Sequence, residues 1–234
     1  MRTGHVIVAI VVLSMITCVA ATAEPTLSGF TGLLTIPTAD TLSNGHFNLG
    51  INSGELENWE DFSYYTNFGL DEGMEVGALV FRSDRSSDGE QMNTASSAMS
   101  RYHVDETFLN LKRALTESED GRPRIAAGVF DVTDEVDTTV YMVATWAQGR
   151  TVGQVEGRDV QLLNLHAGFA SGMIEDFFVG ADLRFGPDLT VMGEWVDDDI
   201  NVGARFSPAD NFTVGAGLLD VDDLAVNVSY SSGL

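Results

Sequence analysis

Ser100, His103 and Asp105 are the side chains whose types and spacing come closest to a hydrolytic site. A serine hydroxyl becomes a nucleophile when an imidazole within hydrogen-bond reach takes its proton, and a third polar group orients that imidazole. These three residues share one polar stretch, where such residues are common for other reasons. We therefore expect no catalytic residue, and lipid hydrolysis stays open only as an alternative.

The stretch 84–89 imitates the first half of a calcium-binding loop. The twelfth position of that loop requires a bidentate glutamate, and this chain has Ala95 there. The single cysteine, Cys18, lies in the leader described below and offers the mature chain no thiolate ligand. We expect neither a metal site nor a cofactor. A net charge of -23 repels polynucleotides, so we exclude nucleic acid as a partner.

Charged side chains recur inside segments that alternate between apolar and polar residues. Over 160–230 the apolar residues fall on one face of each segment, and glycine, amides or charges fall on the other. A period of two indicates β-strands, and a fully aliphatic face indicates lipid on one side and a polar interior on the other. Buried charges must pair, and we expect inward glycines to leave room for six of them: Glu75, Lys112, Asp182, Arg184, Glu194 and Arg205. This polar network would either fill and stiffen the interior or line a narrow conduit for ions or sugars.

The first 23 residues have the features of a secretory signal peptide. A basic start precedes the apolar stretch 6–13, and Ala21-Thr22-Ala23 gives a small-x-small cleavage site. Lipid attachment at Cys18 is the alternative. After residue 23 no apolar run approaches the ~20 residues of a spanning helix, so a mature chain in a membrane must cross it as a barrel.

The alternating segments predict an all-β fold, an antiparallel up-and-down transmembrane β-barrel of about twelve strands. The candidate strands are 46–53, 62–69, 74–82, 107–115, 124–131, 138–147, 160–170, 176–185, 189–196, 199–206, 212–218 and 224–230. The chain then divides into a signal peptide at 1–23, a pre-barrel segment at 24–45 and a barrel at 46–234.

Two alternatives to this fold remain open. Residues 105–115 could make an amphipathic helix that starts with acidic residues, although a hairpin with 124–131 favours a strand. A secreted soluble β-sandwich also has one apolar face on each strand, so it would give a similar pattern. Charges and glycines opposite fully aliphatic faces favour the barrel.

Connection lengths predict which end of the barrel faces the cell exterior. If both termini lie in the periplasm, the odd-numbered connections face outward, and these include the longest one, 83–106. The acidic connections fall on the same side, at 54–61, 132–137, 197–198 and 219–223. Solvated loop tips are the plainer interpretation of these acids. Divalent-cation bridges to lipopolysaccharide are the sharper one, so outer-membrane lipid and lipopolysaccharide are expected partners.

The pre-barrel segment carries two short blocks in a fixed order. Gly29-Phe30-Thr31-Gly32 is followed by Pro37-Thr38-Ala39, and the first alternating strand begins soon after. This opening resembles that of the YjbH-like family of Gram-negative outer-membrane proteins, with weaker similarity as far as about residue 146. The resemblance implies an outer-membrane β-barrel associated with exopolysaccharide production or export, with a polysaccharide or an export complex as partner. The barrel-assembly machinery is a further expected partner. The sequence departs from the common pattern of outer-membrane barrels, because Leu234 stands where a terminal aromatic residue is usual, and Tyr230 would supply that recognition from four residues further in.

The same opening has a physical interpretation. Gly29 and Gly32 permit positive φ or close backbone approach, and Pro37 stiffens the run. Phe30 and its aliphatic neighbours are too apolar to stay in water. The segment therefore either plugs the lumen or is an ordinary lead-in to the first strand.

Overall fold

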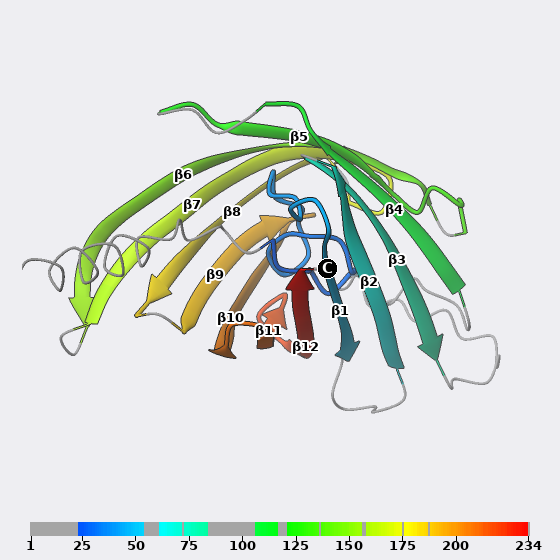
Figure 1. Cartoon of the computed structure of the whole chain (residues 1–234). Coiled ribbons are helices and arrows are strands. Elements are labelled where there is room, and N and C mark those ends of the chain that lie inside the picture. Colours follow the sequence, from blue (N-terminus) through cyan, green and yellow to red (C-terminus); the bar gives the residue numbers. More distant parts are fainter. Residues whose placement is uncertain are drawn as a thin grey trace, which may run out of the picture.

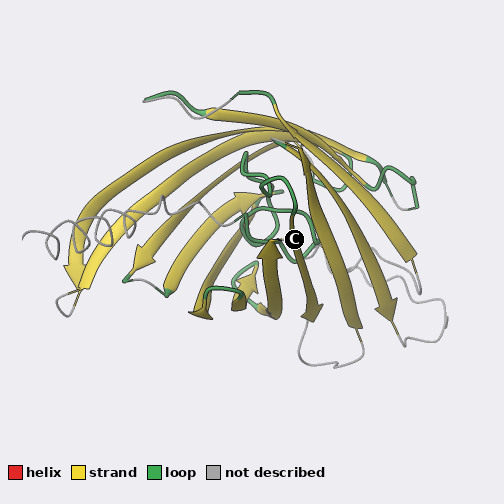
Figure 2. Ribbon diagram, in the orientation of Figure 1, coloured by secondary structure: helices red, strands yellow, loops and turns green. Residues whose placement is uncertain are grey.

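A computed structural model describes residues 23–53, 61–71, 73–83, 106–116, 121–135, 137–155, 158–174, 176–186 and 188–233. The described residues form twelve strands (Figures 1 and 2). These are β1 (His46–Ser53), β2 (Asp61–Asp71), β3 (Met74–Ser83), β4 (Glu106–Ala114), β5 (Arg124–Phe130), β6 (Thr139–Val155), β7 (Arg158–Ser171), β8 (Asp176–Phe185), β9 (Leu189–Val196), β10 (Asp199–Ala209), β11 (Phe212–Leu219) and β12 (Asp223–Gly233). Nowhere in these residues is there a helix of the length and apolar character needed to span a membrane.

The strands close into a single antiparallel barrel. Each strand pairs with its neighbours in sequence, and β1 closes the ring by pairing with β12. At this closure Ile51 lies opposite Val228, and Asn52 lies opposite Asn227. The predicted all-β up-and-down barrel is thus confirmed. The β-sandwich alternative is wrong, because one closed sheet has no second sheet to pack against.

Alternation sorts the side chains between the two faces of the sheet. On β10, Val202 points outward and is 39% exposed, whereas the preceding Asn201 is 3% exposed. Large apolar side chains are exposed around the barrel exterior, among them Leu49, Ile51, Leu109, Leu111, Leu165, Val214, Val228 and Tyr230. An aliphatic exterior around a closed antiparallel barrel is the lipid-facing surface of a transmembrane β-barrel.

Two irregular stretches of the sequence are strands whose inward faces are partly apolar. Residues 106–114 form β4, so the helical alternative for this stretch is wrong. On β3, Leu79 and Phe81 interrupt the polar face, and both are buried inside the barrel. Phe108 of β4 is buried beside them in the same cluster. These apolar residues face an interior that is filled by protein rather than by water.

The β6–β7 hairpin is much longer than alternation predicts. β6 continues to Val155 and β7 begins at Arg158, whereas the pattern gave 138–147 and 160–170. β5 pairs with β6 only as far as Arg124 and Thr145, and every β6 residue from Trp146 onward is exposed. The hairpin therefore extends beyond the end of the barrel at which β1 begins and β12 ends. β6 shows no alternation beyond Thr145, because its residues on both faces are exposed there.

Hairpins at the opposite end are turned by acidic residues. Asp197 and Asp198, between β9 and β10, have φ of 52° and 69°, and Asp220 and Val221, between β11 and β12, have 48° and 60°. Two consecutive left-handed residues are typical of tight hairpin turns, and aspartate adopts that conformation more readily than most residues. Part of the acidic clustering thus reflects turn geometry. The connections 54–60 and 84–105 lie outside the described residues.

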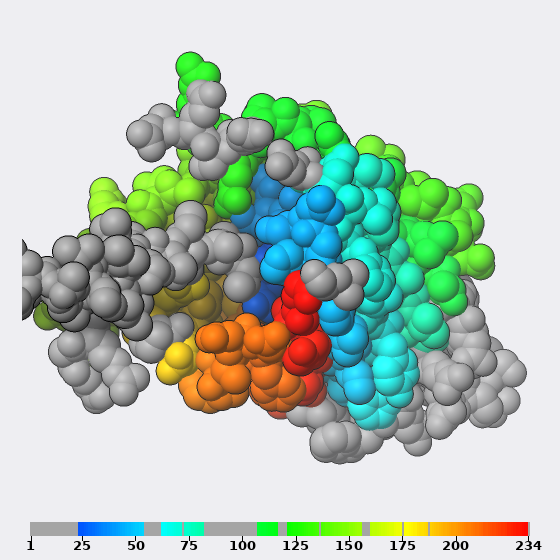
Figure 3. Space-filling view, in the orientation of Figure 1, coloured from blue at the N-terminus to red at the C-terminus, as the bar shows by residue number. Residues whose placement is uncertain are grey.

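Residues 24–42, here called the N-terminal segment, lie inside the barrel. Their chain makes turns and two isolated bridges, Pro25 with Thr31 and Gly32 with Pro37. Most of the segment is buried, and Ile36 is fully so. In Figure 1 these blue residues lie among the strands, and in Figure 3 blue atoms are recessed between the cyan and the orange and red strands. The predicted signal peptide falls almost entirely outside the described residues.

Candidate functional site in the barrel lumen

An aromatic wall holds the ring of Phe30 in the lumen. Phe30 packs edge-on against Phe130 of β5 with ring centroids 5.5 Å apart, and its centroid lies 6.0 Å from that of Tyr141 on β6. Phe108 stacks on the same Phe130 ring at 5.7 Å. Aromatic pairs of this kind add to the free energy of apolar burial, so this cluster anchors the first half of the segment.

Inward glycines on the other side of the barrel make room for the aliphatic residues of the segment. A Cβ atom on Gly180 of β8 would lie 2.5 Å from Cδ1 of Leu33. Cβ atoms on Gly203 and Gly217 would lie 2.7 Å and 2.9 Å from Cδ2 of Leu34. The sequence predicted that such glycines leave room for charges. These three instead leave room for leucine side chains.

Glu194 of β9 accepts hydrogen bonds from consecutive main-chain groups of the segment. Its carboxylate lies 3.1 Å from the Leu34 nitrogen, 2.8 Å from the Thr35 nitrogen and 3.4 Å from the Ile36 nitrogen. The Thr35 hydroxyl donates to the same carboxylate. Asn201, opposite Glu194 on β10, donates to Oε1 at 2.9 Å. Uncharged N–H and O–H donors therefore stabilise this buried carboxylate.

Glu75 and Lys112 face each other across β3 and β4 and hold Thr31 between them. The Thr31 hydroxyl donates to the Glu75 carboxylate at 3.0 and 3.1 Å, and the Leu42 nitrogen donates to it at 3.0 Å. Lys112 Nζ donates to the Thr31 carbonyl at 2.7 Å and to the Asp40 carbonyl at 2.8 Å. The two opposite charges thus bind both ends of one stretch of the segment.

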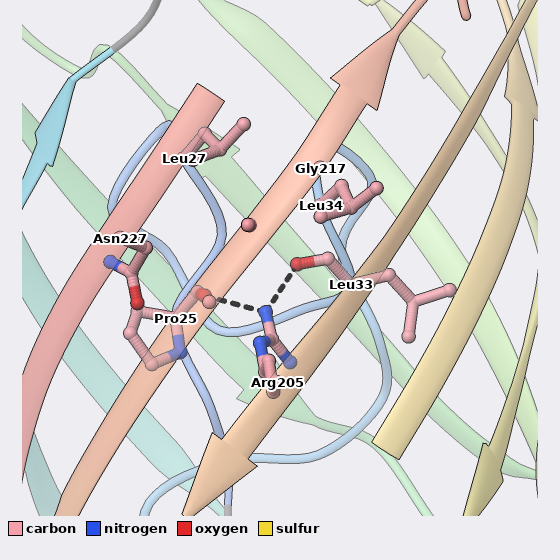
Figure 4. A pocket seen from close by; sticks show the side chains of 9 residues that line it. Pro25, Leu27, Leu33, Leu34, Arg205, Gly217 and Asn227 are labelled. Atoms are coloured by element: carbon pink, nitrogen blue, oxygen red, sulfur yellow. Dashed lines mark hydrogen bonds between the residues drawn. The ribbon is translucent and has the colours of Figure 1, made fainter. Parts of the chain in front are cut away.

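Arg205 of β10 binds three carbonyl oxygens of the segment. Its guanidinium donates to Pro25 at 2.7 Å, to Gly32 at 3.1 Å and to Leu33. Figure 4 shows the bonds to Pro25 and Leu33, in a small pocket that Gly217 and Asn227 also line. The planar fork of arginine can bind several acceptors at once, so one side chain fixes two turns of the segment.

Amide side chains complete the contacts from β1 and β2. Asn52 donates to the Leu27 carbonyl and Asn67 donates to the Gly29 carbonyl, each at 2.6 Å. Like the charged residues, these amides bind main-chain groups. Apart from hydroxyl groups, Glu24 and Asp40, the barrel wall therefore recognises the backbone of the segment and the shape of its apolar side chains.

The six predicted lumen charges do not act alike. Glu75, Lys112, Glu194 and Arg205 bind the N-terminal segment, as described above. Asp182 instead accepts from the Asn164 nitrogen at 2.8 Å and lies 3.9 Å from His166, whereas Arg184 makes no ion pair within the described part of the chain. Among those residues no two of the six charges pair directly with each other.

The opening block lies at the centre of these contacts. Gly29 has φ of 85°, and a Cβ on Gly32 would lie 2.1 Å from the Ile36 carbonyl, so both glycines are required by the turns they form. Thr38 donates its main-chain N–H to the Thr31 carbonyl at 3.4 Å. The Ala39 nitrogen donates to the Thr145 hydroxyl at 2.9 Å.

Three further residues hold the segment but were not predicted. Thr145 receives the Ala39 N–H, Asn67 binds Gly29, and Arg124 forms an ion pair with Asp40. The alternating pattern of their strands places Thr145 and Asn67 on inward faces, so the sequence indicated that both side chains point into the lumen. Arg124 is the first residue of β5, so the alternating pattern does not indicate which face of the sheet its side chain lies on.

The candidate hydrolytic residues Ser100, His103 and Asp105 lie outside the described residues, as does the stretch from 84 to 95. Within the described ranges no group of three or more histidine, cysteine or acidic side chains could hold a metal ion. The lumen residues described above make hydrogen bonds and an ion pair with the N-terminal segment.

The fold and the lumen together define a class of protein. A closed antiparallel barrel with an aliphatic exterior and a polar interior is an outer-membrane β-barrel, here with its own N-terminal residues in the lumen.

Comparison with solved structures finds a porin and an outer-membrane channel at low sequence identity. No protein-family model matches the chain, and no curated protein matches it. The KdgM porin has a TM-score of 0.47 at 9% identity, over 81% of this chain and 99% of its own. An outer-membrane channel from Pseudomonas putida F1 has a TM-score of 0.38 at 13% identity, over 86% and 100%. OprB from Pseudomonas putida, in a low-pH structure, has 0.30 at 12% identity, over 81% and 91%.

Proposed function

We propose that this protein is an outer-membrane channel that its own N-terminal segment keeps closed. The observation that carries the proposal is the polar interior of the wall, whose charged groups bind main-chain atoms of residues 24–42. Removing the segment would leave Glu75, Lys112, Glu194 and Arg205 facing an open lumen. Such charges are expensive to bury without partners but are stable in a wet channel.

A permanently filled barrel with a purely structural role is the second candidate. The aromatic cluster around Phe30 favours it, because Phe108, Phe130 and Tyr141 are fully or nearly fully buried in the lumen. The polar side of the wall favours the channel. Four charges directed at one segment are more than filling requires, since apolar residues of similar volume usually stabilise a buried site as well or better.

The resemblance of residues 28–40 to the YjbH-like opening supports a more specific role. We propose that the channel acts in exopolysaccharide production or export, together with an export complex. Comparing extracellular polysaccharide in a deletion strain and in a strain complemented with the full chain tests this. Equal amounts in both strains would remove the polysaccharide role and leave the channel untouched.

Conductance in planar lipid bilayers tests the closed channel directly. The full chain is compared with a variant that lacks residues 24–42 and keeps the predicted signal peptide. Without the segment the lumen fills with water, so we expect at least a severalfold rise in single-channel conductance.

The matched control changes the barrel far from the lumen. In this control Asn-Gly replaces residues 154–159 at the tip of the β6–β7 hairpin, between the paired Gly153 and Val160, and we expect the conductance of the full chain. Heat-modifiable electrophoretic mobility must show that both variants are folded. Equal conductance in the folded deletion variant and the full chain would reject the closed channel in favour of the structural barrel.

A further inference from the structure

The turn from Gly32 to Pro37 forms a concave site of main-chain donors. The two end residues form an isolated bridge, and the Leu33 nitrogen donates to the Ile36 carbonyl at 3.0 Å. This tight turn points the N–H groups of Leu34, Thr35 and Ile36 to one side, toward Glu194. Successive N–H groups that converge in this way make an anion-binding concavity.

The anion in this concavity is the Glu194 carboxylate, and both of its oxygens accept hydrogen bonds from the turn. Oε1 of Glu194 accepts from the nitrogen and the hydroxyl of Thr35, and Oε2 accepts from the nitrogens of Leu34 and Ile36. Glu194 is 4% exposed, so these donors take the place of water. Arg205 binds the carbonyls of Gly32 and Leu33, which places a positive charge on the same turn.

We propose that the Gly32–Pro37 turn is a carboxylate-binding site and that Glu194 is its built-in occupant. The ligand class is a carboxylate-bearing solute, because a two-oxygen anion matches the pairs of donors on the turn. Once the segment leaves the wall, the turn carries an empty site that such a solute fills. This last step rests on the proposed channel, whereas the binding site rests on the geometry alone.

Chemical rescue tests the site with acetate as the probe. Thr38, which is 4% exposed, is replaced by cysteine as a reporter of segment docking, in a Cys18→Ser background. The full chain in detergent is treated with a maleimide, and the labelling rate of the reporter measures how often the segment leaves the wall. Glu194→Ala removes a charged acceptor of several hydrogen bonds, so we expect labelling about 10- to 100-fold faster.

Acetate should then restore slow labelling in Glu194→Ala, because it fits the space and the donors that the glutamate leaves. Chloride at the same ionic strength should not restore it. Glu194→Gln is the matched control, because its amide fills the same space and leaves no room for acetate. Its labelling should be faster than that of the parent chain and insensitive to acetate.

Three outcomes would overturn the proposed site. These are no change in labelling for Glu194→Ala, equal rescue by acetate and chloride, or equal rescue of the alanine and glutamine variants. None of them depends on conductance. Failure of the channel proposal, seen as an unchanged conductance on deletion of 24–42, is therefore distinguishable from failure of the carboxylate site.

Discussion

Individual cationic side chains in the lumen bind carbonyl oxygens of residues that lie far away in the sequence. Lys112 binds the carbonyls of Thr31 and Asp40 and is 2% exposed. Its neighbour Arg113 points outward and pairs with Asp71 at 2.7 Å, with about half of each side chain exposed. Adjacent positions on one strand thus carry a buried binding residue and a surface ion pair.

Lys112→Met should loosen the N-terminal segment without opening the barrel. Each buried hydrogen bond to a charged group contributes roughly 1.5–3 kcal/mol, so reporter labelling at position 38 should rise at least tenfold. Arg113→Met is the control, because an exposed pair contributes about 0–1 kcal/mol and its labelling rate should stay near that of the parent. Similar rates in the two variants would contradict the assigned role of Lys112.

Gly180→Val should displace the segment by steric overlap. A Cβ at Gly180 would lie 2.5 Å from Leu33 and 2.8 Å from Ile36, and overpacking of this kind costs about 1–3 kcal/mol. Gly193→Val is the matched control on β9, where the nearest atom to an added Cβ is 3.9 Å away. We expect faster reporter labelling only for the first variant. Equal labelling of the two variants would show that the packing of Leu33 does not require a glycine at position 180.

The facing of these residues could be predicted from sequence, but their partners could not. Parity along the strands places Glu75, Glu194 and Arg205 inside, because a period of two is a local property. Their partners lie in residues 24–42, which have no period and come from as far as 180 positions away, as between Arg205 and Pro25. The predicted pairing of charge with charge missed that main-chain groups can satisfy a buried ion equally well.

At the scale of elements, strands were predictable where one face is buried. β8 (Asp176–Phe185) and β9 (Leu189–Val196) match the predicted 176–185 and 189–196 in full. The extension of β6 was not predictable, since both of its faces are exposed beyond Thr145 and its pairing with β7 shows two irregular shifts of register. The tight turns of the N-terminal segment were equally hidden, because tertiary contacts rather than periodicity determine them.

The β6–β7 extension should be dispensable for barrel stability. Its residues beyond Trp146 bury little surface and have no partner strand on the β5 side among the described residues. Replacing residues 154–159 by Asn-Gly, which keeps the buried Val160, should therefore leave the temperature of the electrophoretic mobility shift within a few degrees of the parent. A large drop would show that the extension contributes to the folding of the barrel.

In the whole molecule the usual distribution of residues is reversed, because many aliphatic side chains lie on the barrel exterior and many polar side chains are buried in its interior. Removing detergent from the purified protein should cause aggregation, because outward residues such as Val202, Val214 and Val228 would meet water. Analytical ultracentrifugation in plain buffer measures this. A stable, monodisperse protein without detergent would contradict the lipid-facing exterior, and a strongly acidic chain makes that a demanding test, since its net charge of -23 opposes aggregation.

Closure of the ring between the first and last strands sets an order of events during biogenesis. The polar residues that bind the segment come from β1 to β6 at one side of this seam and from β9 and β10 at the other. Residues 24–42 are synthesised before any of the strands, yet their complete binding surface exists only after β12 has paired with β1. A chain that stalls before β12 would therefore leave the apolar side chains of this segment without a complete binding surface.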